Sequence, residues 1–332
     1  MKTPRVPRKF ARLRHAGITT GFWVLLCVAP AFGAQDPGNY PGKLGIAGAI
    51  GLTAEQRAVE ARFAAYLEAN TDAAIARYLE KFGNEINADN ARELSSDYAP
   101  GGIEAEDAST NAARTRWGEA VHEPASALVK EIYRRALAKD TPPNRRKQVV
   151  FTAGGAGVGK TTSIRKLAEL SNAVEAAEIV FDTTLTTFGG AVARITQALD
   201  AGRMVSIVFV YRDPVVSLVD GVLPRAQVNG RTVPLEVFLS SHLGAVETIL
   251  KIAETYKNDP RLAVAIIDNR DGTASAKPAD LAFVKSMARR YTREDLKVKL
   301  SRALEEAYEK GKRGGKNGIA EAVYRAIKGP AS

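Results

Sequence analysis

The chain has 332 residues, of which 45% are hydrophobic and 25% are charged, so it can bury a substantial core and is not a disordered protein. Its formal net charge of +10 would by itself suggest a nucleic-acid partner. Much of this excess lies near the N-terminus, at Lys2, Arg5, Arg8, Lys9, Arg12 and Arg14. The remainder is only mildly basic and has no basic patch with interleaved aromatic residues, so we expect no nucleic-acid partner.

The N-terminal segment has the layout of a secretory signal peptide. Basic residues are followed by the uncharged stretch 16–35 and then by small residues, so we expect residues 1–34 to be a signal peptide. The alternatives are an uncleaved membrane anchor and a misassigned start codon. The first two interpretations predict an exported protein, periplasmic or secreted, that meets the membrane only through this segment. A wrong start codon predicts a cytoplasmic protein.

A linker, residues 35–52, precedes a helical region that we place at 53–145. Thr53 and Gln56 form a capping box, which predicts a helix running to Asn70. Thr71 is expected to cap a second helix that Gly83 ends. Two further helices are predicted at 112–120 and 124–139, and the polar stretch 87–107 is predicted to be a loop.

Residues 154–161 read Gly-Gly-Ala-Gly-Val-Gly-Lys-Thr, a complete G-x-x-x-x-G-K-[ST] phosphate-binding loop. An apolar strand precedes it and a helix-compatible stretch follows it, so backbone N–H groups would converge on one polyphosphate. Lys160 would reach the β- and γ-phosphates of ATP, and the Thr161 hydroxyl would bind Mg²⁺. The predicted nucleotide-binding residues are Gly154, Gly155, Ala156, Gly157, Val158, Gly159, Lys160, Thr161 and Thr162.

After this loop, apolar strands alternate with amphipathic helices. Strands are predicted at 177–181, 205–211 and 261–267, and helices at 188–201 and 234–256. This alternation predicts an α/β fold of the P-loop NTPase or kinase type, with a parallel sheet flanked by helices. The kinase core would span 146–272, with helical extensions on both sides, the C-terminal one covering 273–332.

Three aspartates follow predicted strands, where such sheets bind their ligands. Asp182 would accept the proton of an attacking hydroxyl or hold Mg²⁺ through water, and its alternative role is to cap the following turn. Asp213 precedes Pro214 and is expected to form a turn. Asp268 is either a second metal-side carboxylate or a loop cap.

Arginines stabilise the negative charge that phosphoryl transfer spreads over the phosphate oxygens. Arg225 and Arg231 lie in a stretch rich in turn residues between a strand and a long helix. We therefore expect a mobile loop that brings both guanidinium groups over the phosphates, with a solvated basic loop as the alternative.

Taken in order, the phosphate loop, Asp182, the segment from Arg225 to Pro234 and the strand end at 267–269 resemble the zeta-toxin family of P-loop kinases. The upstream segments 86–94 and 121–128 also resemble sequences that precede the loop in some zeta-like proteins. The resemblance covers roughly residues 84 to 270. The arginine segment is more specific than the phosphate loop, which many NTPases share.

The resemblance implies ATP-dependent phosphorylation of a hydroxyl on a small nucleotide-sugar, UDP-N-acetylglucosamine in the best-known members, and a cognate antitoxin as partner. By position, Asp182 would be the catalytic base, and Arg225 and Arg231 would clamp the transferred phosphate. The family usually has an acidic residue in a first strand after the loop and an Asp/Glu-Gly-Thr segment in the next. If Asp182 belongs to the second of these, Asp89 is the candidate base.

Export conflicts with ATP chemistry, because the space outside the inner membrane holds essentially no ATP. Delivery into another cell, a wrong start codon, or a loop that binds without turnover would each resolve the conflict. A separate alternative is an NTP-driven assembly or transfer factor. No Asn-Lys-x-Asp sequence is present, which argues against a GTPase.

Overall fold

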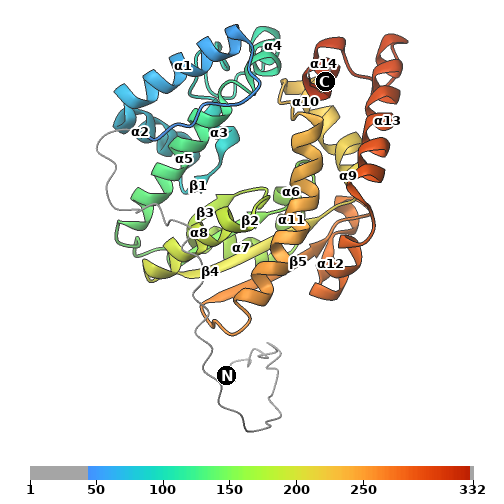
Figure 1. Cartoon of the computed structure of the whole chain (residues 1–332). Helices are drawn as coiled ribbons and strands as arrows, with labels where there is room; N and C mark the ends of the chain where they lie inside the picture. Colours follow the sequence, from blue (N-terminus) through green and yellow to red (C-terminus); the bar gives the residue numbers. More distant parts are fainter. Residues whose placement is uncertain (1–43, 330–332) are drawn as a thin grey trace, which may run out of the picture. The chain divides into compact units, whose positions relative to one another are not determined.

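The structure is a computed structural model that describes residues 44–329 (Figure 1). The predicted signal peptide at 1–34 and part of the predicted linker lie outside these residues. Within the described part, no helix combines the length and the apolar character needed to cross a membrane.

The fold is α/β and is built on one six-stranded sheet with the order β1-β3-β2-β4-β5-β6. The first five strands are parallel and β6 is antiparallel to β5. The strands are β1 (Glu85–Ile86), β2 (Arg146–Ala153), β3 (Ala177–Asp182), β4 (Met204–Tyr211), β5 (Leu262–Asp268) and β6 (Lys277–Ala279). Strand β2, which leads into the phosphate loop, thus lies between β3 and β4.

Side chains alternate between the two faces of the sheet, and helices cover both faces. Phe151 of β2 points into the larger core, whereas its neighbour Val150 points into the smaller one. The larger core includes residues of α5 (His122–Leu137), α8 (Phe188–Asp200) and α11 (Leu235–Thr255). The smaller core contains residues of the short helices α6 (Lys160–Arg165) and α7 (Ala168–Ala176). Both faces are therefore shielded from water, as the sequence predicts for a parallel sheet.

The N-terminal helices begin and end close to the predicted positions. Helix α1 (Ala54–Ala69) has the predicted capping box between Thr53 and Gln56, and α2 (Thr71–Phe82) ends at Gly83. The cap of α2 was predicted wrongly, because the Thr71 hydroxyl donates to the carbonyl of Leu67 in the preceding helix instead. Helix α4 (Ala108–Trp117) follows.

Two small elements in the predicted loop 87–107 and just before it were missed by sequence reasoning. The edge strand β1 is held by Tyr78, whose hydroxyl donates to the Glu85 carbonyl and accepts from the Asn87 amide. Helix α3 (Ala88–Arg92) starts directly after it, and the Asn87 side chain caps it by accepting from the Asp89 amide. A two-residue strand has no periodicity to read, so only its place in the sheet reveals it.

The C-terminal part forms a third hydrophobic core beside the sheet. It contains residues of the π-helix η1 (Leu218–Val222), α10 (Leu223–Asn229), α11, α13 (Arg293–Lys312) and α14 (Glu321–Lys328). Helix α9 (Pro214–Ser217), the short 3-10 helix η2 (Thr273–Ser275) and α12 (Leu281–Ala288) complete the fold. Thus the segment that carries Arg225 is packed into this core and is not the mobile loop that we expected.

Candidate active site

The phosphate loop adopts a backbone that requires glycine. Gly154, Gly157 and Gly159 have φ values of 137°, 73° and 78°. A Cβ atom at Gly154 would lie 2.3 Å from the Val210 carbonyl oxygen, and one at Gly157 would lie 2.5 Å from that of Ser217. The loop is therefore pressed against the end of β4 and against α9, so that no side chain can be added at these two positions without a shift of the backbone.

Two buried side chains from distant parts of the sequence fix the loop. Nε2 of His242 lies 2.9 Å from the carbonyl oxygen of Ala156, and Nδ2 of Asn269 donates to the carbonyl of Val158 at 2.6 Å. Burial lowers the pKa of His242 to about 4, so the imidazole is neutral at pH 7. Because a carbonyl oxygen only accepts hydrogen bonds, the proton of this neutral ring lies on Nε2.

Lys160 lies at the mouth of the loop. Its Nζ atom is 3.3 Å from Oδ1 of Asp182, 3.3 Å from the carbonyl oxygen of Thr183 and 3.4 Å from that of Gly154. The side chains of Thr161 and Thr162 are exposed at the start of α6. The ammonium group and the Thr161 hydroxyl are thus accessible to a nucleotide phosphate and its metal ion.

Asp182 ends β3, directly beside the strand that leads into the phosphate loop. Its Oδ1 accepts from the Thr152 hydroxyl at 2.7 Å, and its Oδ2 accepts from Nδ2 of Asn87 at 2.9 Å. The carboxylate makes these side-chain contacts and does not cap the turn that follows. It is held next to Lys160, where P-loop enzymes place the carboxylate that assists metal binding.

These residues fit an Mg²⁺ ion bound together with a nucleotide. Within residues 44–329 no cluster of three or more His, Cys, Asp or Glu side chains could hold a metal. Mg²⁺ needs no such cluster, because it usually keeps several waters and binds to one or two protein oxygens plus substrate phosphates. Thr161 and Asp182 supply oxygens of this kind.

A second group of charged side chains lies around Asp89 on α3; we call it the arginine cluster, and it consists of Asp89, Arg92, His122, Arg225 and Arg231. Arg92 lies 3.3 Å from Oδ1 of Asp89, and Arg225 lies 3.9 Å from Oδ2. Nη2 of Arg92 is 2.5 Å from Nδ1 of His122. Burial alone would raise the pKa of Asp89, but the surrounding arginines outweigh it and hold this pKa well below its usual range.

Arg231 belongs both to this cluster and to a buried ion-pair network. Its Nη2 atom lies 2.9 Å from Oε1 of Glu93, whose side chain is completely buried. The same carboxylate binds Arg114 of α4 at 2.7 Å and accepts from the Glu104 amide. Arg231 is therefore fixed from one side by a structural carboxylate.

The arginine cluster has more positive than negative charge and unsatisfied donors. The Nε atoms of Arg92, Arg225 and Arg231 are buried without a hydrogen-bond partner in the part of the chain that the structure describes. Buried donors of this kind are uncommon in folded proteins and call for an acceptor. Phosphate oxygens are the acceptors that guanidinium groups bind best, so this cluster fits a phosphoryl group.

The positions of the predicted arginines differ in part from expectation. Arg225 lies on helix α10, which has Pro224 in its first turn and ends at Gly230 in the left-handed conformation. Only Arg231 lies in the loop that follows. Pro224 and Gly230 led us to predict a loop, but they mark the two ends of a short helix. Sequence reasoning also missed Arg92 and His122, which only the packing of α3 against α5 brings to the cluster.

The other two aspartates have structural contacts. Asp213 caps α9 by accepting from the amides of Val215 and Val216, as the expected turn role requires. Asp268 binds both the amide and the guanidinium group of Arg270. Of the two roles considered for Asp268, the structure favours the loop cap.

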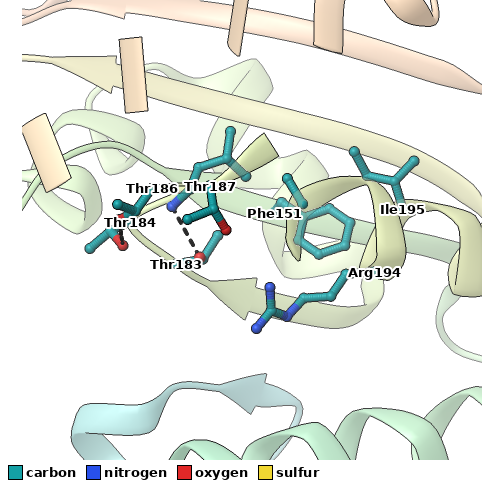
Figure 2. A pocket seen from close by; sticks show the side chains of 9 residues that line it. Phe151, Thr183, Thr184, Thr186, Thr187, Arg194 and Ile195 are labelled. Atoms are coloured by element: carbon teal, nitrogen blue, oxygen red, sulfur yellow. Dashed lines mark hydrogen bonds between the residues drawn. The ribbon is translucent and has the colours of Figure 1, made fainter. Parts of the chain in front are cut away.

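A cavity of about 170 Å³ adjoins the Asp182 side of the site (Figure 2). We call it the threonine pocket, because the segment between β3 and α8 lines it with four threonines. Arg194 of α8 and Phe151 lie on its other side (Figure 2). The full lining is Phe151, Thr183, Thr184, Leu185, Thr186, Thr187, Ala191, Arg194 and Ile195. Sequence reasoning did not predict this pocket.

Comparison with known proteins identifies one family. Residues 173–277 match the family model described as zeta toxin, and no curated protein matches the chain. The matched segment includes Asp182, Arg225 and Arg231, and it begins after the phosphate loop. Zeta-toxin domains are kinase-like, which supports ATP-dependent phosphoryl transfer as the general activity. The phosphate loop and the parallel sheet give the chain a P-loop kinase type of fold, and its segment 173–277 is similar to the zeta-toxin family.

Proposed function

We propose that the protein is an ATP- and Mg²⁺-dependent kinase that phosphorylates a hydroxyl of a small nucleotide-sugar. The observation that carries this proposal is the pair formed by Lys160 and Asp182, 3.3 Å apart at the mouth of a glycine loop, in a chain with a zeta-toxin match. The nucleotide-sugar acceptor is taken from the resemblance to that family and is part of the proposal.

The two chemical tasks of the site, metal binding and proton removal, fall to different carboxylates. Both oxygens of Asp182 already accept hydrogen bonds, and the residue lies on the strand adjacent to β2. We assign it to the Mg²⁺ site together with Thr161. Asp89 follows the outer strand β1 and its side chain is 34% exposed, so it is open to an incoming hydroxyl. We assign Asp89 as the base. This is the alternative that follows from the sequence if Asp182 belongs to the second acidic segment of the family pattern.

In the reaction, the acceptor hydroxyl oxygen forms a bond to the γ-phosphorus while the bond from that phosphorus to the β–γ bridging oxygen breaks. The hydroxyl proton passes to the Asp89 carboxylate, and ADP leaves with the bonding electrons. Lys160, Arg225 and Arg231 stabilise the negative charge on the phosphate oxygens, and Mg²⁺ neutralises part of it. Since the pKa of Asp89 is held low, this carboxylate is ionised throughout the neutral pH range.

The test is incubation of the protein with γ-labelled ATP, Mg²⁺ and a panel of nucleotide-sugars. Asp89→Asn should keep ATP affinity and lose roughly a hundredfold or more in turnover, the usual contribution of a general base. Asp182→Asn should raise the Mg²⁺ concentration needed for activity. Asp72→Asn, on the exposed side of α2, is the matched control and should behave as the wild type.

Three results would change the proposal. If Asp89→Asn remains active while Asp182→Asn loses turnover without a change in Mg²⁺ requirement, Asp182 is the base. Label that appears only as free phosphate would favour an NTP-driven assembly factor. Absence of nucleotide binding would exclude a kinase.

We also propose an exported protein that acts after delivery to an ATP-containing compartment, with a cognate antitoxin protecting the producing cell. This rests on the signal-like sequence and on the family resemblance alone. The N-terminal sequence of the mature protein tests the signal peptide, because a start near Gln35 supports cleavage and export, whereas an intact Met1 leaves the uncleaved anchor and the wrong start codon, which the location of the protein then separates.

A further inference from the structure

Arg194 is a guanidinium group beside the candidate active site that lacks a carboxylate partner. Among residues 44–329 it forms no ion pair, whereas most arginines of the core have one. Its Nη1 atom donates to the Gly190 carbonyl one turn earlier at 2.9 Å, and its guanidinium carbon lies 5.3 Å from the centroid of the Phe181 ring. These contacts hold the side chain in place but leave its charge uncompensated.

The uncompensated charge of Arg194 favours the binding of an anion. Burial lowers the pKa of Arg194, which means that its surroundings disfavour the positive charge. A charge that is partly removed from water is normally paired. A bound phosphate or carboxylate would supply that pairing, and the planar guanidinium group binds either one through two parallel hydrogen bonds.

The threonine pocket beside Arg194 has the donors that an anion or a sugar needs. The hydroxyls of Thr184 and Thr186 are 2.7 Å apart, and the Thr183 hydroxyl accepts from the Leu185 amide. Leu185 has a φ of 55°, a left-handed conformation that is rare for a leucine. Such strain is found more often at functional sites, and here it turns the threonine segment around the pocket.

The pocket is contiguous with the site of phosphoryl transfer. Thr183 lines the pocket, and its carbonyl oxygen accepts from Nζ of Lys160 at 3.3 Å. A group bound in the pocket is therefore separated from the P-loop lysine by a single residue. The volume of about 170 Å³ is slightly larger than the roughly 150 Å³ cavity that holds one benzene molecule. It suffices for one sugar ring or for a phosphate with its linking atoms.

We propose that the threonine pocket binds the anionic group of the phosphoryl acceptor through Arg194, so that the protein selects sugars that carry a phosphate or a carboxylate over neutral sugars. This rests on the proposed kinase function and narrows its substrate class. A nucleotide-sugar meets the requirement through its diphosphate. A sugar 1-phosphate and a uronic acid meet it without a nucleotide.

The experiment compares a free sugar with its 1-phosphate, its uronic acid and its nucleotide derivative as acceptors. The wild type should use the anionic acceptors at least tenfold more efficiently than the free sugar. In Arg194→Gln the KM of the anionic acceptors should rise about ten- to a hundredfold, the range expected for a charged hydrogen bond, with kcat little changed. The KM of the free sugar should stay the same. Arg194→Lys should recover part of the loss, because it restores the charge but not the fork of donors.

Arg302→Gln is the matched control, because Arg302 lies on α13 with a side chain 82% exposed, and it should leave every constant unchanged. Equal use of neutral and anionic acceptors by the wild type would overturn the proposal, even if Arg194→Gln does not fold. An anion preference that survives in a folded Arg194→Gln would overturn it as well.

Failure of the kinase function itself would look different. In that case no acceptor is labelled, and calorimetric titration of the sugar 1-phosphate into the wild type and Arg194→Gln replaces the kinetic test. Binding that depends on Arg194 supports the anion pocket without the kinase. Binding that is absent, or independent of Arg194, rejects the pocket.

Discussion

The two halves of the candidate site are built in different ways. The nucleotide half is local: β2, the glycine loop and α6 form one continuous stretch, residues 146–165. The arginine cluster is assembled from α3, α5, α10 and the loop after α10, and the bond from Arg231 to Glu93 spans 138 residues of sequence. The nucleotide half needs contacts from outside it, such as those of His242 and Asn269, only to fix a loop that is already continuous, whereas the assembled half exists only when the surrounding helices are packed. We therefore expect substitutions in the nucleotide half to change activity more than stability, and substitutions in the assembled half to change stability more than ATP binding.

The helix that carries Arg225 is attached to α4 by hydrogen bonds from side chains to backbone carbonyls. Nδ2 of Asn111 donates to the Val228 carbonyl at 2.9 Å, and the Thr115 hydroxyl donates to the Gly230 carbonyl at 3.2 Å. Arg225 and Arg231 are thus positioned by α4 as well as by the C-terminal core. Weakening this attachment tests whether the assembled half is rigid or closes over the substrate.

The largest effect is expected at Lys160. Lys160→Ala should reduce turnover at least about a thousandfold, equivalent to roughly 4 kcal/mol, because the ammonium group stabilises the phosphates in the transition state. The free energy of unfolding should change by only about 1 kcal/mol, since the ion pair with Asp182 is long, at 3.3 Å, and still partly exposed to solvent. Labelled ATP and urea denaturation measure the two quantities.

Lys147→Ala, at an exposed position of β2, is the control and should change neither quantity. A Lys160→Ala variant that unfolds would show that the nucleotide half is not as independent as its local construction indicates.

The opposite pattern is expected at Glu93. Glu93→Gln removes the buried charge that pairs with Arg114 and Arg231, and breaking such a pair costs about 3 to 5 kcal/mol of stability. Urea denaturation should show this loss, while ATP affinity, measured on the folded fraction, should stay close to that of the wild type. Glu55→Gln, which removes the exposed partner of Arg116, should have little effect. Equal stability of Glu93→Gln and wild type would contradict an assembled half held together by this network.

The contrast between local and assembled parts also explains which elements could be predicted from the sequence. The phosphate loop, the strands 177–181, 205–211 and 261–267 and the long helices were predicted correctly in type, because each has its own periodicity or motif within a few residues. The observed ends of the strands differ from the predicted ends by one or two residues. This is expected, because hydrogen bonds to the neighbouring strands decide where the last residue pair of a strand forms. The α/β fold followed from these local signals, and so did the resemblance to the zeta-toxin family that the match at 173–277 supports.

What the sequence did not reveal depends on contacts between distant segments. Strand β1 owes its existence to the Tyr78 hydroxyl and to pairing with β3, and the arginine cluster gains Arg92 and His122 only through the packing of α3 on α5. Arg194 has no motif around it and becomes notable only because no carboxylate faces it in the fold. The roles of Arg225 and Arg231 remain predictions, and so do those of Asp89 and Asp182, which the Asp89→Asn and Asp182→Asn variants decide.

Two histidines of the described residues allow a test by pH, because His242 contacts the phosphate loop and His122 belongs to the arginine cluster. The pKa of His242 is depressed to about 4 by burial, against 6.5 for an unperturbed histidine. Its contribution to stability is complete above pH 6.5 and is lost as the pH falls toward 4, because the unfolded chain gains the proton first. At roughly 1.4 kcal/mol per pKa unit, this amounts to about 3 kcal/mol.

Urea denaturation at pH 7 and pH 4.5 measures this effect. His242→Gln should lose less stability between the two pH values than the wild type does. His122 also has a lowered pKa of about 4, through burial and the neighbouring Arg92, but 47% of its side chain is exposed. Its Gln variant should therefore change the pH dependence less. The reverse order would show that the arginine cluster, and not the loop contact, dominates acid stability.

The smallest effect concerns the attachment of α10 to α4. Two glycines with similar φ values allow the contribution of this attachment to be measured separately. Gly230 and Gly202 have φ values of 74° and 71°, so Gly→Ala costs a similar strain of about 1 to 2 kcal/mol at both. A Cβ at Gly230 would also lie 2.0 Å from the Asn111 carbonyl oxygen, whereas at Gly202 the nearest atom is the flexible end of Lys147 at 3.4 Å. Because Asn111 lies on α4, the additional loss in Gly230→Ala, expected to be about 1 kcal/mol, reports on the contact between α4 and α10.

The kinetic consequence decides whether that contact serves the reaction. If α4 holds Arg231 in its working position, Gly230→Ala should raise the acceptor KM or lower kcat several-fold, while Gly202→Ala leaves both unchanged. A Gly230→Ala variant that loses stability but keeps full turnover would mean that α10 finds its place over the phosphates without α4. The arginines would then form a closing lid, as the sequence first suggested, and the packed arrangement seen here would be only one of its positions.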